Sequence, residues 1–239
     1  MKHKEIIIVP TYNERDNIVS HLSILTSMYP EILILVVDDN SPDGTGDLVR
    51  EFSKNHPNVS LLTRSKKTGL GDAYKSALLS LKDRSDIGVI YTMDADGSHD
   101  PKYIEEFRTA LKNADLVIGS RYVEGGGVSN WDWSRRFLSK GGNLYSGFLL
   151  RVSIHDLTAG FVGFSKEMLD RINLAAIASD GYAYQIEFKY RMAKAGARIR
   201  EVPIIFSERI AGRSKMNYRI ILEGLLIPLR IFWRRMLRE

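Results

Sequence analysis

The sequence predicts an α/β fold, in which a mostly parallel, open, Rossmann-like sheet carries helices on its faces. Short apolar runs rich in β-branched residues recur along the first half of the chain, and stretches with helical spacing separate them. This alternation is typical of units in which a helix crosses over between two parallel strands. Polar loops that follow several of these runs place a candidate site at one edge of the sheet.

Five runs are predicted as strands of one buried parallel sheet. Their continuous apolar character is expected of strands that helices cover on both faces. The runs are EIIIVP (5–10), ILILVVDD (32–39), VSLLTR (59–64), IGVIYTMD (87–94) and ADLVIGSR (114–121). A late strand is expected within REVPIIFSER (200–209).

Two of the stretches between the strands are predicted as helices. Apolar residues from Ile18 to Met28 recur three or four positions apart, which predicts a helix with one apolar face. Pro101 opens PKYIEEFRTALKN (101–113), between the fourth and fifth strands. Proline is favoured at the first position of a helix, because the N–H group that it lacks would have no partner there.

The composition excludes several classes of function. The chain has 239 residues, of which 44% are hydrophobic, enough for the core of one compact domain. Cysteine is absent, which excludes thiolate catalysis and cysteine-based metal sites, so any metal must be held by oxygen or histidine. The formal net charge of +5 suits phosphorylated ligands or an anionic membrane as much as nucleic acid. No Walker A sequence and no Gly-x-Ser-x-Gly elbow occurs.

Four polar loops are predicted to form one site. In an open parallel sheet the ligand crevice lies at the carboxyl ends of the strands, and each loop follows such an end. Asp39 ends the second run beside this crevice, where a carboxylate can accept a hydrogen bond from a base or a ribose hydroxyl, whereas Asp38 should face the opposite side. The loops are TYNERDN (11–17), NSPDGTGD (40–47), SKKTGLGD (65–72) and DADGSHDP (94–101).

The fourth run ends in two acids separated by one small residue. In an extended segment Asp94 and Asp96 project the same way, and two carboxylates repel each other unless a positive group lies between them. Mg²⁺ or Mn²⁺, held by these oxygens together with a substrate diphosphate and water, would relieve that repulsion. A helix-capping turn and a calcium loop are the alternatives, and against the calcium loop stand His99 at its required glycine position and Pro101 in its middle.

Six blocks in order along the chain resemble the polyprenyl (dolichyl) phosphate mannose synthases, which are inverting glycosyltransferases of family 2 with the GT-A fold. The resemblance implies transfer of mannose from GDP-mannose to a polyprenyl phosphate, with Mg²⁺ or Mn²⁺ as cofactor. Alternatives are another donor such as UDP-glucose, and a non-catalytic nucleotide-sugar-binding protein. The blocks are VPTYNERDNI (9–18), VVDDNSPDGTGD (36–47), KTGLGDAY (67–74), MDADGSHDP (93–101), GSRYVEGG (119–126) and DLTAGF (156–161).

The resemblance assigns roles to individual residues. The positions that match nucleotide contacts are Pro10, Tyr12, Glu14, Val37, Asp39 and Ala95. The matching metal ligands are Asp94 and Asp96, with Ser98 at a third position. The matching contacts to the acceptor phosphate are Arg121, Arg135 and Ser139, of which the last two lie four residues apart and so share a helix face. The matches to a loop that closes over the donor diphosphate are Arg209 and Lys215.

The chain departs from the family pattern in two places. Val162 stands where many members carry arginine, and GYAYQIEF (181–188) matches its counterpart only approximately. Gln185 and Glu187 are therefore expected to support the site rather than to act in catalysis. A phosphate acceptor is already ionised near neutral pH and needs no general base, so His99→Ala is expected to leave substantial activity.

The resemblance divides the chain into a catalytic domain at 1–216 and a C-terminal amphipathic basic helix at 217–239. Within the domain, residues 1–121 are the nucleotide-binding half and residues 122–216 the acceptor-binding half. Glu223, Pro228 and Arg230 interrupt the apolar residues of the tail, so no uninterrupted apolar stretch approaches the roughly 20 residues that a bilayer-spanning helix needs.

The tail is typical of a helix that lies in a membrane interface, because Trp233 stands beside several arginines. We expect peripheral contact with the cytoplasmic face of a membrane. A helix packed on the core or on a partner is the alternative, and a membrane subunit is a further partner that the resemblance allows. The acidic crevice loops argue against nucleic acid as a ligand.

Overall fold

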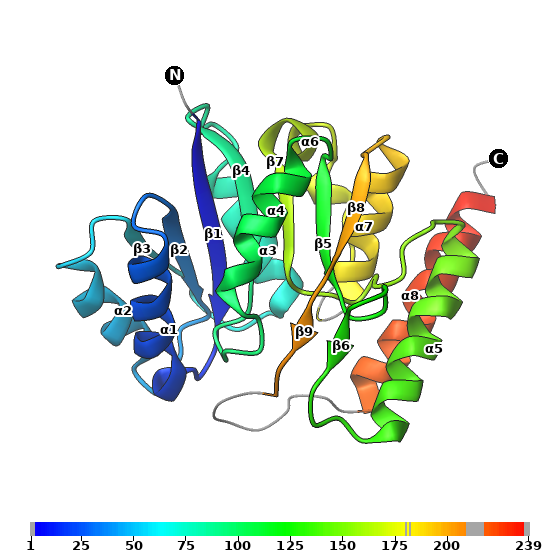
Figure 1. The fold of residues 1–239 in the computed structure, drawn as a ribbon, viewed down its shortest axis with the longest axis horizontal. Helices are drawn as coiled ribbons and strands as arrows, with labels where there is room; N and C mark the ends of the chain where they lie inside the picture. Colours follow the sequence, from blue (N-terminus) through cyan, green and yellow to red (C-terminus); the bar gives the residue numbers. More distant parts are fainter. Residues whose placement is uncertain (1–2, 180, 182, 209–217, 237–239) are drawn as a thin grey trace.

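The fold is an open α/β sheet, seen in a computed structural model that describes residues 3–179, 181, 183–208 and 218–236. The strands of this sheet are β1 (Lys4–Thr11), β2 (Leu33–Asp38), β3 (Val59–Thr63), β4 (Ile87–Thr92), β5 (Leu116–Ser120), β7 (Val162–Ser165) and β8 (Ile199–Pro203). They lie in the order β3-β2-β1-β4-β7-β5-β8, with helices on both faces (Figure 1). Neighbours pair in parallel except β7, which is antiparallel to β4 and β5. The predicted α/β class with a mostly parallel sheet is confirmed.

The helices alternate with the strands along the first half of the chain, as predicted. They are α1 (Arg15–Met28), α2 (Thr45–Ser53), α3 (Leu70–Ser80), α4 (Ile104–Leu111), α5 (Trp133–Leu150), α6 (Lys166–Asp170), α7 (Ala183–Lys194) and α8 (Tyr218–Met236), with short 3₁₀ turns η1 (Pro101–Tyr103) and η2 (Leu174–Ala176). Alternate residues of β1 enter two cores: Ile6 and Ile8 pack on the α3 and α7 side, and Ile7 packs on the α1 and α4 side. Burial on both faces explains why the runs are continuously apolar.

The apolar face of α1 differs from the prediction at its end. Leu22 and Leu25 are fully buried, but Met28 is 45% exposed and Tyr29 fills the core in its place. Met28 is the last residue of α1, so the helical spacing no longer decides which side chain turns inward. The prediction was therefore wrong for Met28.

The helix that Pro101 opens begins as the 3₁₀ turn η1 and continues as α4. The side chain of Asp100 accepts a hydrogen bond from the backbone N–H of Lys102 at 3.0 Å, which caps this start. The start at Pro101 is confirmed.

The second half of the chain adds its strands to the same sheet. The sequence did not predict β7, which lies in TAGFVGFS (158–165) and separates β4 from β5. The late strand is present but divided: β8 pairs with β5, and β9 (Ile205–Phe206) pairs with β6 (Gly127–Val128) in a second, two-stranded sheet.

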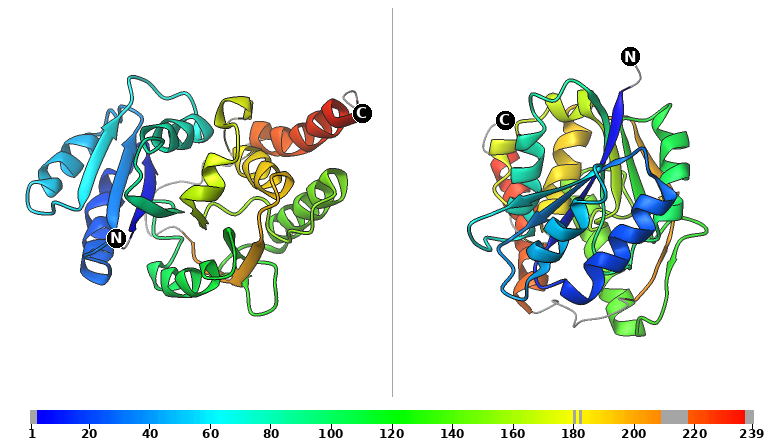
Figure 2. Two further views of the ribbon diagram at one scale, coloured as in Figure 1. Left: turned by 90° about the horizontal axis from the view of Figure 1, so that it is seen from above. Right: turned by 90° about the vertical axis from the view of Figure 1, so that its left-hand side faces the viewer.

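The helices α5 and α8 lie side by side at the β8 end of the molecule (Figures 1 and 2). The hydroxyl of Tyr145 on α5 donates to the carbonyl oxygen of Leu225 on α8 at 3.0 Å. The helix expected in the C-terminal tail is therefore observed over residues 218–236. Across the described ranges, no helix is long and apolar enough to cross a membrane.

Candidate active site

Two adjoining cavities open at the carboxyl ends of β1, β2 and β4. The smaller one, of about 130 Å³, and the larger one, of about 430 Å³, share Leu70 and Asp94 in their walls. The smaller cavity is lined by Pro10, Thr11, Tyr12, Glu14, Asp39, Lys67, Gly69, Leu70, Ala73, Asp94, Ala95 and Asp96. The structure thus brings together all but one of the residues matched to the nucleotide and the two carboxylates matched to the metal.

Val37 is the exception among these residues. It lies in β2, is fully buried in the core and lines neither cavity. Its side chain packs in the core with Ile6, Ile8 and Ala73.

Three of the four predicted loops line the smaller cavity, and the second loop supports the first. The hydroxyl of Thr45 accepts a hydrogen bond from the backbone N–H of Glu14 at 3.0 Å. The carboxylate of Asp43 accepts from the backbone N–H of Arg15 at 3.1 Å. The second loop thus holds Glu14 in the cavity wall while contributing no lining residue after Asp39.

Asp39 is held in place by a basic residue that the sequence interpretation did not single out. Nη1 of Arg64 lies 2.6 Å from Oδ1 of Asp39 in a largely buried ion pair. Burial raises the pKa of Asp39 above its ordinary value, and the nearby Arg64 opposes this rise. Asp38 instead accepts a hydrogen bond from the hydroxyl of Thr11 at 3.0 Å and lines neither cavity, so the two acids face opposite sides as predicted.

Lys67 is a second basic residue that sequence reasoning missed. Its Nζ lies 3.9 Å from the centroid of the Tyr12 ring, inside the smaller cavity. A cation at this distance is attracted to the face of an aromatic ring. The only signal in the sequence was the pair of lysines in the third loop.

The carboxylate pair lies in a turn and not on an extended strand. β4 ends at Thr92, so the alternation of an extended segment does not place Asp94 and Asp96, although both line the smaller cavity. Oδ1 of Asp96 accepts hydrogen bonds from the backbone N–H and the hydroxyl of Ser98, at 3.0 and 2.6 Å. Ser98 is fully buried and lines neither cavity, so it orients Asp96 from behind.

His99 holds the other carboxylate-bearing residue. The backbone N–H of Asp94 donates to Nδ1 of His99 at 3.0 Å, and the imidazole stacks on Phe161 with 5.2 Å between ring centroids. A nitrogen that accepts this hydrogen bond carries no proton of its own. His99 therefore positions the chain at Asp94.

The donor set at this turn fits a hard divalent cation. Within the part of the chain that the structure describes, no three His, Cys, Asp or Glu side chains gather in a way that could hold a metal by protein alone. Mg²⁺ is commonly bound through one or two carboxylates, with substrate phosphate and water as its other ligands. Asp94 and Asp96 at the edge of an open cavity match that arrangement.

Arg121 lies in the wall of the larger cavity, fixed by a buried acid. Its Nε and Nη2 each lie 2.7 Å from an oxygen of Asp156, and Nη2 also lies 2.7 Å from the hydroxyl of Thr158. Burial acts to raise the pKa of Asp156, but the guanidinium outweighs it and holds this pKa below the ordinary value. Among the described residues these bonds use Nε and Nη2, which leaves Nη1 for a ligand.

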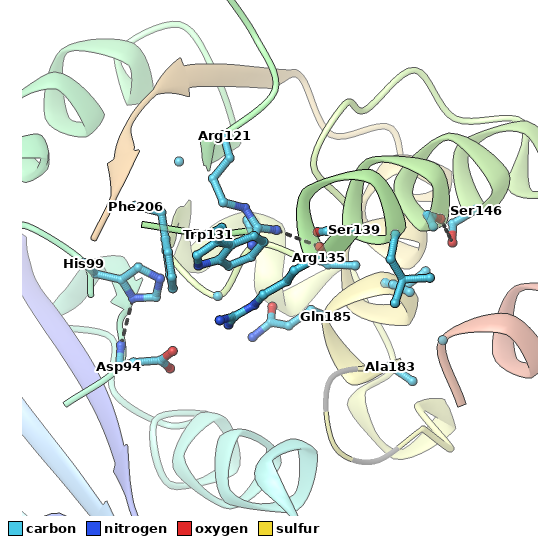
Figure 3. A pocket seen from close by; sticks show the side chains of 18 of the residues that line it. Asp94, His99, Arg121, Trp131, Arg135, Ser139, Ser146, Ala183, Gln185 and Phe206 are labelled. Carbon is cyan, nitrogen blue, oxygen red and sulfur yellow. Dashed lines mark hydrogen bonds between the residues drawn. The ribbon is translucent and has the colours of Figure 1, made fainter. Parts of the chain in front are cut away.

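Arg135 and Ser139 line the same cavity from α5, as their spacing predicts (Figure 3). With Gly142 and Ser146 they form one stripe along the helix. The guanidinium of Arg135 lies 4.0 Å from the centroid of the Trp131 ring and reaches into the middle of the cavity, on the side of Asp94 (Figure 3).

The remaining predicted residues differ in their distance from the site. Gln185 lines the larger cavity, whereas Glu187 lies behind it, where its carboxylate accepts from the backbone N–H of Ser179 at 3.0 Å. Val162 is buried in β7. Two more, Arg209 and Lys215, lie outside the described residues.

In an open α/β sheet the carboxyl ends of the strands are the usual place of a ligand site, and the carboxylate pair and the adjoining arginine-lined cavity lie there. The family described as glycosyl transferase family 2 matches residues 6–172 of the chain. The chain belongs to glycosyltransferase family 2, and it is a glycosyltransferase.

Two curated relatives match nearly the whole chain. A polyprenol monophosphomannose synthase of Mycolicibacterium smegmatis is 45% identical over 93% of this chain and 84% of its own length. An undecaprenyl-phosphate mannosyltransferase of Micrococcus luteus is 42% identical over 92% of this chain and 90% of its own length. The resemblance to the polyprenyl phosphate mannose synthases is confirmed.

Solved structures confirm the GT-A fold. A glucosyl-3-phosphoglycerate synthase from Mycobacterium tuberculosis, in complex with Mn²⁺, UDP and glucosyl-3-phosphoglycerate, superposes with a TM-score of 0.65 at 15% identity, over 96% of this chain and 80% of that chain. A mannosyltransferase from Pyrobaculum calidifontis, in complex with GDP-Man and Mn²⁺, gives a TM-score of 0.59 at 21% identity, over 100% of this chain and 65% of that chain. At these identities the likeness concerns the fold alone.

Proposed function

We propose that the enzyme transfers mannose from GDP-mannose to a polyprenyl phosphate with inversion, giving polyprenyl phosphate mannose and GDP. The observation that carries this proposal is the meeting of two different cavities at Asp94. One is lined by acids and an aromatic ring suited to a nucleotide, and the other by two arginines suited to a phosphate. The names of the two curated relatives support the sugar and the acceptor.

The donor nucleotide occupies the smaller cavity in this proposal. Tyr12 offers a ring face, and the carboxylate of Asp39 offers acceptors for the base or the ribose. The names of the curated relatives support mannose as the sugar, and GDP-mannose is the donor that we propose. Arg209 and Lys215 would contact the donor diphosphate.

Asp94 and Asp96 would hold Mg²⁺ or Mn²⁺ at the donor diphosphate. When bound, such a cation supplies positive charge that neutralises the charge developing on the departing GDP. Ser98 orients the carboxylate of Asp96 and His99 holds the backbone of Asp94, which supports this role. Both structural neighbours described above contain Mn²⁺.

The acceptor phosphate would bind Arg121, Arg135 and Ser139 in the larger cavity. Arginine presents a planar fork that matches phosphate oxygens, and a phosphate monoester is ionised near neutral pH. The two arginines therefore need only to position the attacking oxygen, with no general base. Entry of the acceptor from the adjoining cavity would let its oxygen attack the face of the anomeric carbon away from GDP, as inversion requires.

Two helices would place the enzyme on the cytoplasmic face of a membrane. Four apolar residues of α5 share one helix face and are exposed: Trp133, Phe137, Leu144 and Phe148. On the adjacent α8, Leu222, Leu226 and Trp233 are exposed as well. α8 packs on α5 and α7 with its other side, so it serves both as a packed helix and as an exposed apolar surface. A membrane subunit that covers this surface is the alternative partner.

The experiment that tests this function is transfer of labelled sugar into lipid extract. Purified enzyme receives a polyprenyl phosphate, Mg²⁺ or Mn²⁺, and either GDP-mannose or UDP-glucose in parallel. We expect metal-dependent transfer from GDP-mannose. NMR of the product should show the β-anomer and not the α-anomer, as inversion requires. Asp96→Ala should lower the rate by about a hundredfold or more, since it removes a ligand of the cation that stabilises the developing charge. Transfer only from UDP-glucose would contradict the donor, and equal rates in Asp96→Ala would contradict the metal site.

A further inference from the structure

Lys189 is a fully buried lysine whose amine lies directly behind the larger cavity. It stands on α7 and has no solvent-exposed surface, which is unusual for a lysine. Its Nζ lies 3.0 Å from the carbonyl oxygen of Leu157 and 2.6 Å from that of Ala159. The same Nζ lies 3.3 Å from Oε1 of Gln185, one helical turn earlier. Ala159 and Gln185 are themselves part of the cavity wall.

The partners of Lys189 favour the charged form of its amine. Each is a carbonyl or amide oxygen, including the backbone oxygen of Gln185 at 3.4 Å, and none can donate. An ammonium has three N–H donors for them, whereas a neutral amine would turn a lone pair toward oxygen. Burial opposes this charge and lowers the pKa of Lys189 to about 7. Of the charged groups that face it, Asp156 and Glu201 favour the ammonium and Arg121 disfavours it.

The bonds of Lys189 determine how two neighbouring groups face the cavity. Because Oε1 of Gln185 accepts from Lys189, the amide nitrogen and its two N–H donors point toward the cavity (Figure 3). The carbonyls of Leu157 and Ala159 flank Thr158, whose hydroxyl binds Nη2 of Arg121 at 2.7 Å. Lys189 therefore holds both the backbone around Thr158 and the amide of Gln185.

We propose that Lys189 is a positioning residue for the acceptor site: its ammonium holds the segment 157–159 and turns the Gln185 amide donors toward the bound phosphate. The proposal rests on the proposed function, because it takes the larger cavity as the acceptor site. The smaller cavity shares no partner with Lys189, so nucleotide binding should not depend on it.

The test is calorimetric binding of two separate ligands, farnesyl phosphate and GDP with Mn²⁺, to wild type, Lys189→Met and Lys166→Met. Methionine keeps the length of the buried stem without the charge. Lys166 is the matched control, because it too is buried, donates to the carbonyl oxygen of Lys82 at 3.1 Å and lines neither cavity. At about pH 6, Lys189→Met should weaken the binding of farnesyl phosphate about tenfold, as expected for lost hydrogen bonds. The affinity for GDP should stay within about twofold of the wild-type value. Lys166→Met should change neither.

The pH dependence separates positioning from a merely structural role. Because burial lowers the pKa of Lys189 to about 7, we expect the wild type to lose the ammonium toward about pH 9 and its advantage over Lys189→Met to shrink to less than about threefold. An equal loss of GDP affinity, the same pattern in Lys166→Met, or a tenfold difference that persists at about pH 9 would overturn the proposal. Wild type that binds GDP and not farnesyl phosphate would overturn the proposed acceptor as well, which distinguishes the two failures.

Gln185→Leu provides a second variant that removes the cavity-facing amide without adding a charge to the core. Gln185→Leu should weaken the binding of farnesyl phosphate to the same extent. Adding Lys189→Met to it should lower the affinity little further, because the effects of substituting residues that act through each other are not additive. Full additivity would contradict action through Gln185. If Lys189→Met does not fold, the test compares the affinity of wild type and Gln185→Leu for farnesyl phosphate across pH. The wild type should lose affinity toward about pH 9. The affinity of Gln185→Leu should depend much less on pH.

Discussion

Arg121 and Asp156 form a bidentate ion pair in the wall of the larger cavity, with both contacts at 2.7 Å and Asp156 completely buried. The backbone N–H of Arg121 also donates to the same carboxylate at 3.0 Å. The acid therefore fixes the guanidinium in one orientation. Among the described residues no hydrogen bond uses Nη1, which leaves this nitrogen for a ligand. A phosphate then meets an arginine that loses no further side-chain freedom on binding.

We expect Asp156→Asn to damage both stability and acceptor binding. It leaves the Arg121 charge without its buried partner, which commonly lowers the free energy of unfolding by about 3–5 kcal/mol. Chemical denaturation measures this change. Glu167→Gln is the control, because Glu167 pairs with Arg171 on the surface, where such a pair contributes less than about 1 kcal/mol. Similar losses in both variants would contradict a special role for Asp156.

The lowered pKa of Asp156 predicts how the stability of the fold depends on pH. Its pKa is lowered in the folded protein, so the stability that it contributes is present above the ordinary carboxyl pKa of about 3.9 and is lost as the pH falls through the lower, folded-state value. Thermal unfolding followed between about pH 6 and pH 3 should show wild type losing stability toward acid and Asp156→Asn losing less of it. Parallel curves would contradict this assignment.

Arg135→Ala should raise the KM for the polyprenyl phosphate about tenfold or more, because it removes a charged hydrogen-bond donor from the cavity. The KM for the donor should stay within about twofold. The neighbouring Arg136→Ala is the control, since Arg136 is exposed and lines neither cavity. A comparable effect of both substitutions on the acceptor KM would point to general attraction by positive charge instead.

His99→Ala should lower the rate about tenfold without changing the shape of the pH–rate profile. His99 accepts from the backbone N–H of Asp94 and stacks on Phe161, so its loss loosens the turn that carries the carboxylates. A residue that acted as a general base would instead abolish one limb of the profile. Steady-state rates across pH, with GDP and Mn²⁺ affinity measured alongside, decide between positioning and proton transfer.

Phe137→Ser combined with Phe148→Ser should reduce binding to liposomes that contain anionic lipid. Phe137 and Phe148 are 75% and 81% exposed, and they share one face of α5. Lipid flotation measures the change, and activity on water-soluble farnesyl phosphate should be retained. Leu79→Ser on α3 is the control, because Leu79 is 55% exposed on a different helix. Unchanged flotation of the double variant would exclude α5 as the contact surface.

Much of the nucleotide side was predictable from the order of the loops. Tyr12, Asp39 and Asp96 follow three different strands and meet in one cavity, because parallel strands bring their carboxyl ends to the same edge. Val37 shows where this reasoning stops. Membership in a motif does not say whether a side chain of a buried strand reaches the cavity.

The acceptor side was only partly predictable. The shared helix face of Arg135 and Ser139 follows from local spacing, and the structure shows both in the cavity wall. The partner of Arg121 lies 35 residues away, and Lys189 meets Leu157 across 32 residues, so no local pattern connects them. The acid of DLTAGF was visible in the sequence, but its partner was not.

The sequence by itself determined the α/β class, the positions of the predicted strands and the set of loops at the ligand edge, because these depend on periodicity and on turn-forming residues near in the chain. Only the tertiary structure decided that β7 enters the sheet antiparallel between β4 and β5, that Arg64 pairs with Asp39, and that Lys189 lies buried behind Gln185. Those outcomes depend on which distant segments share a core, where a buried charge must find a partner to offset the loss of water.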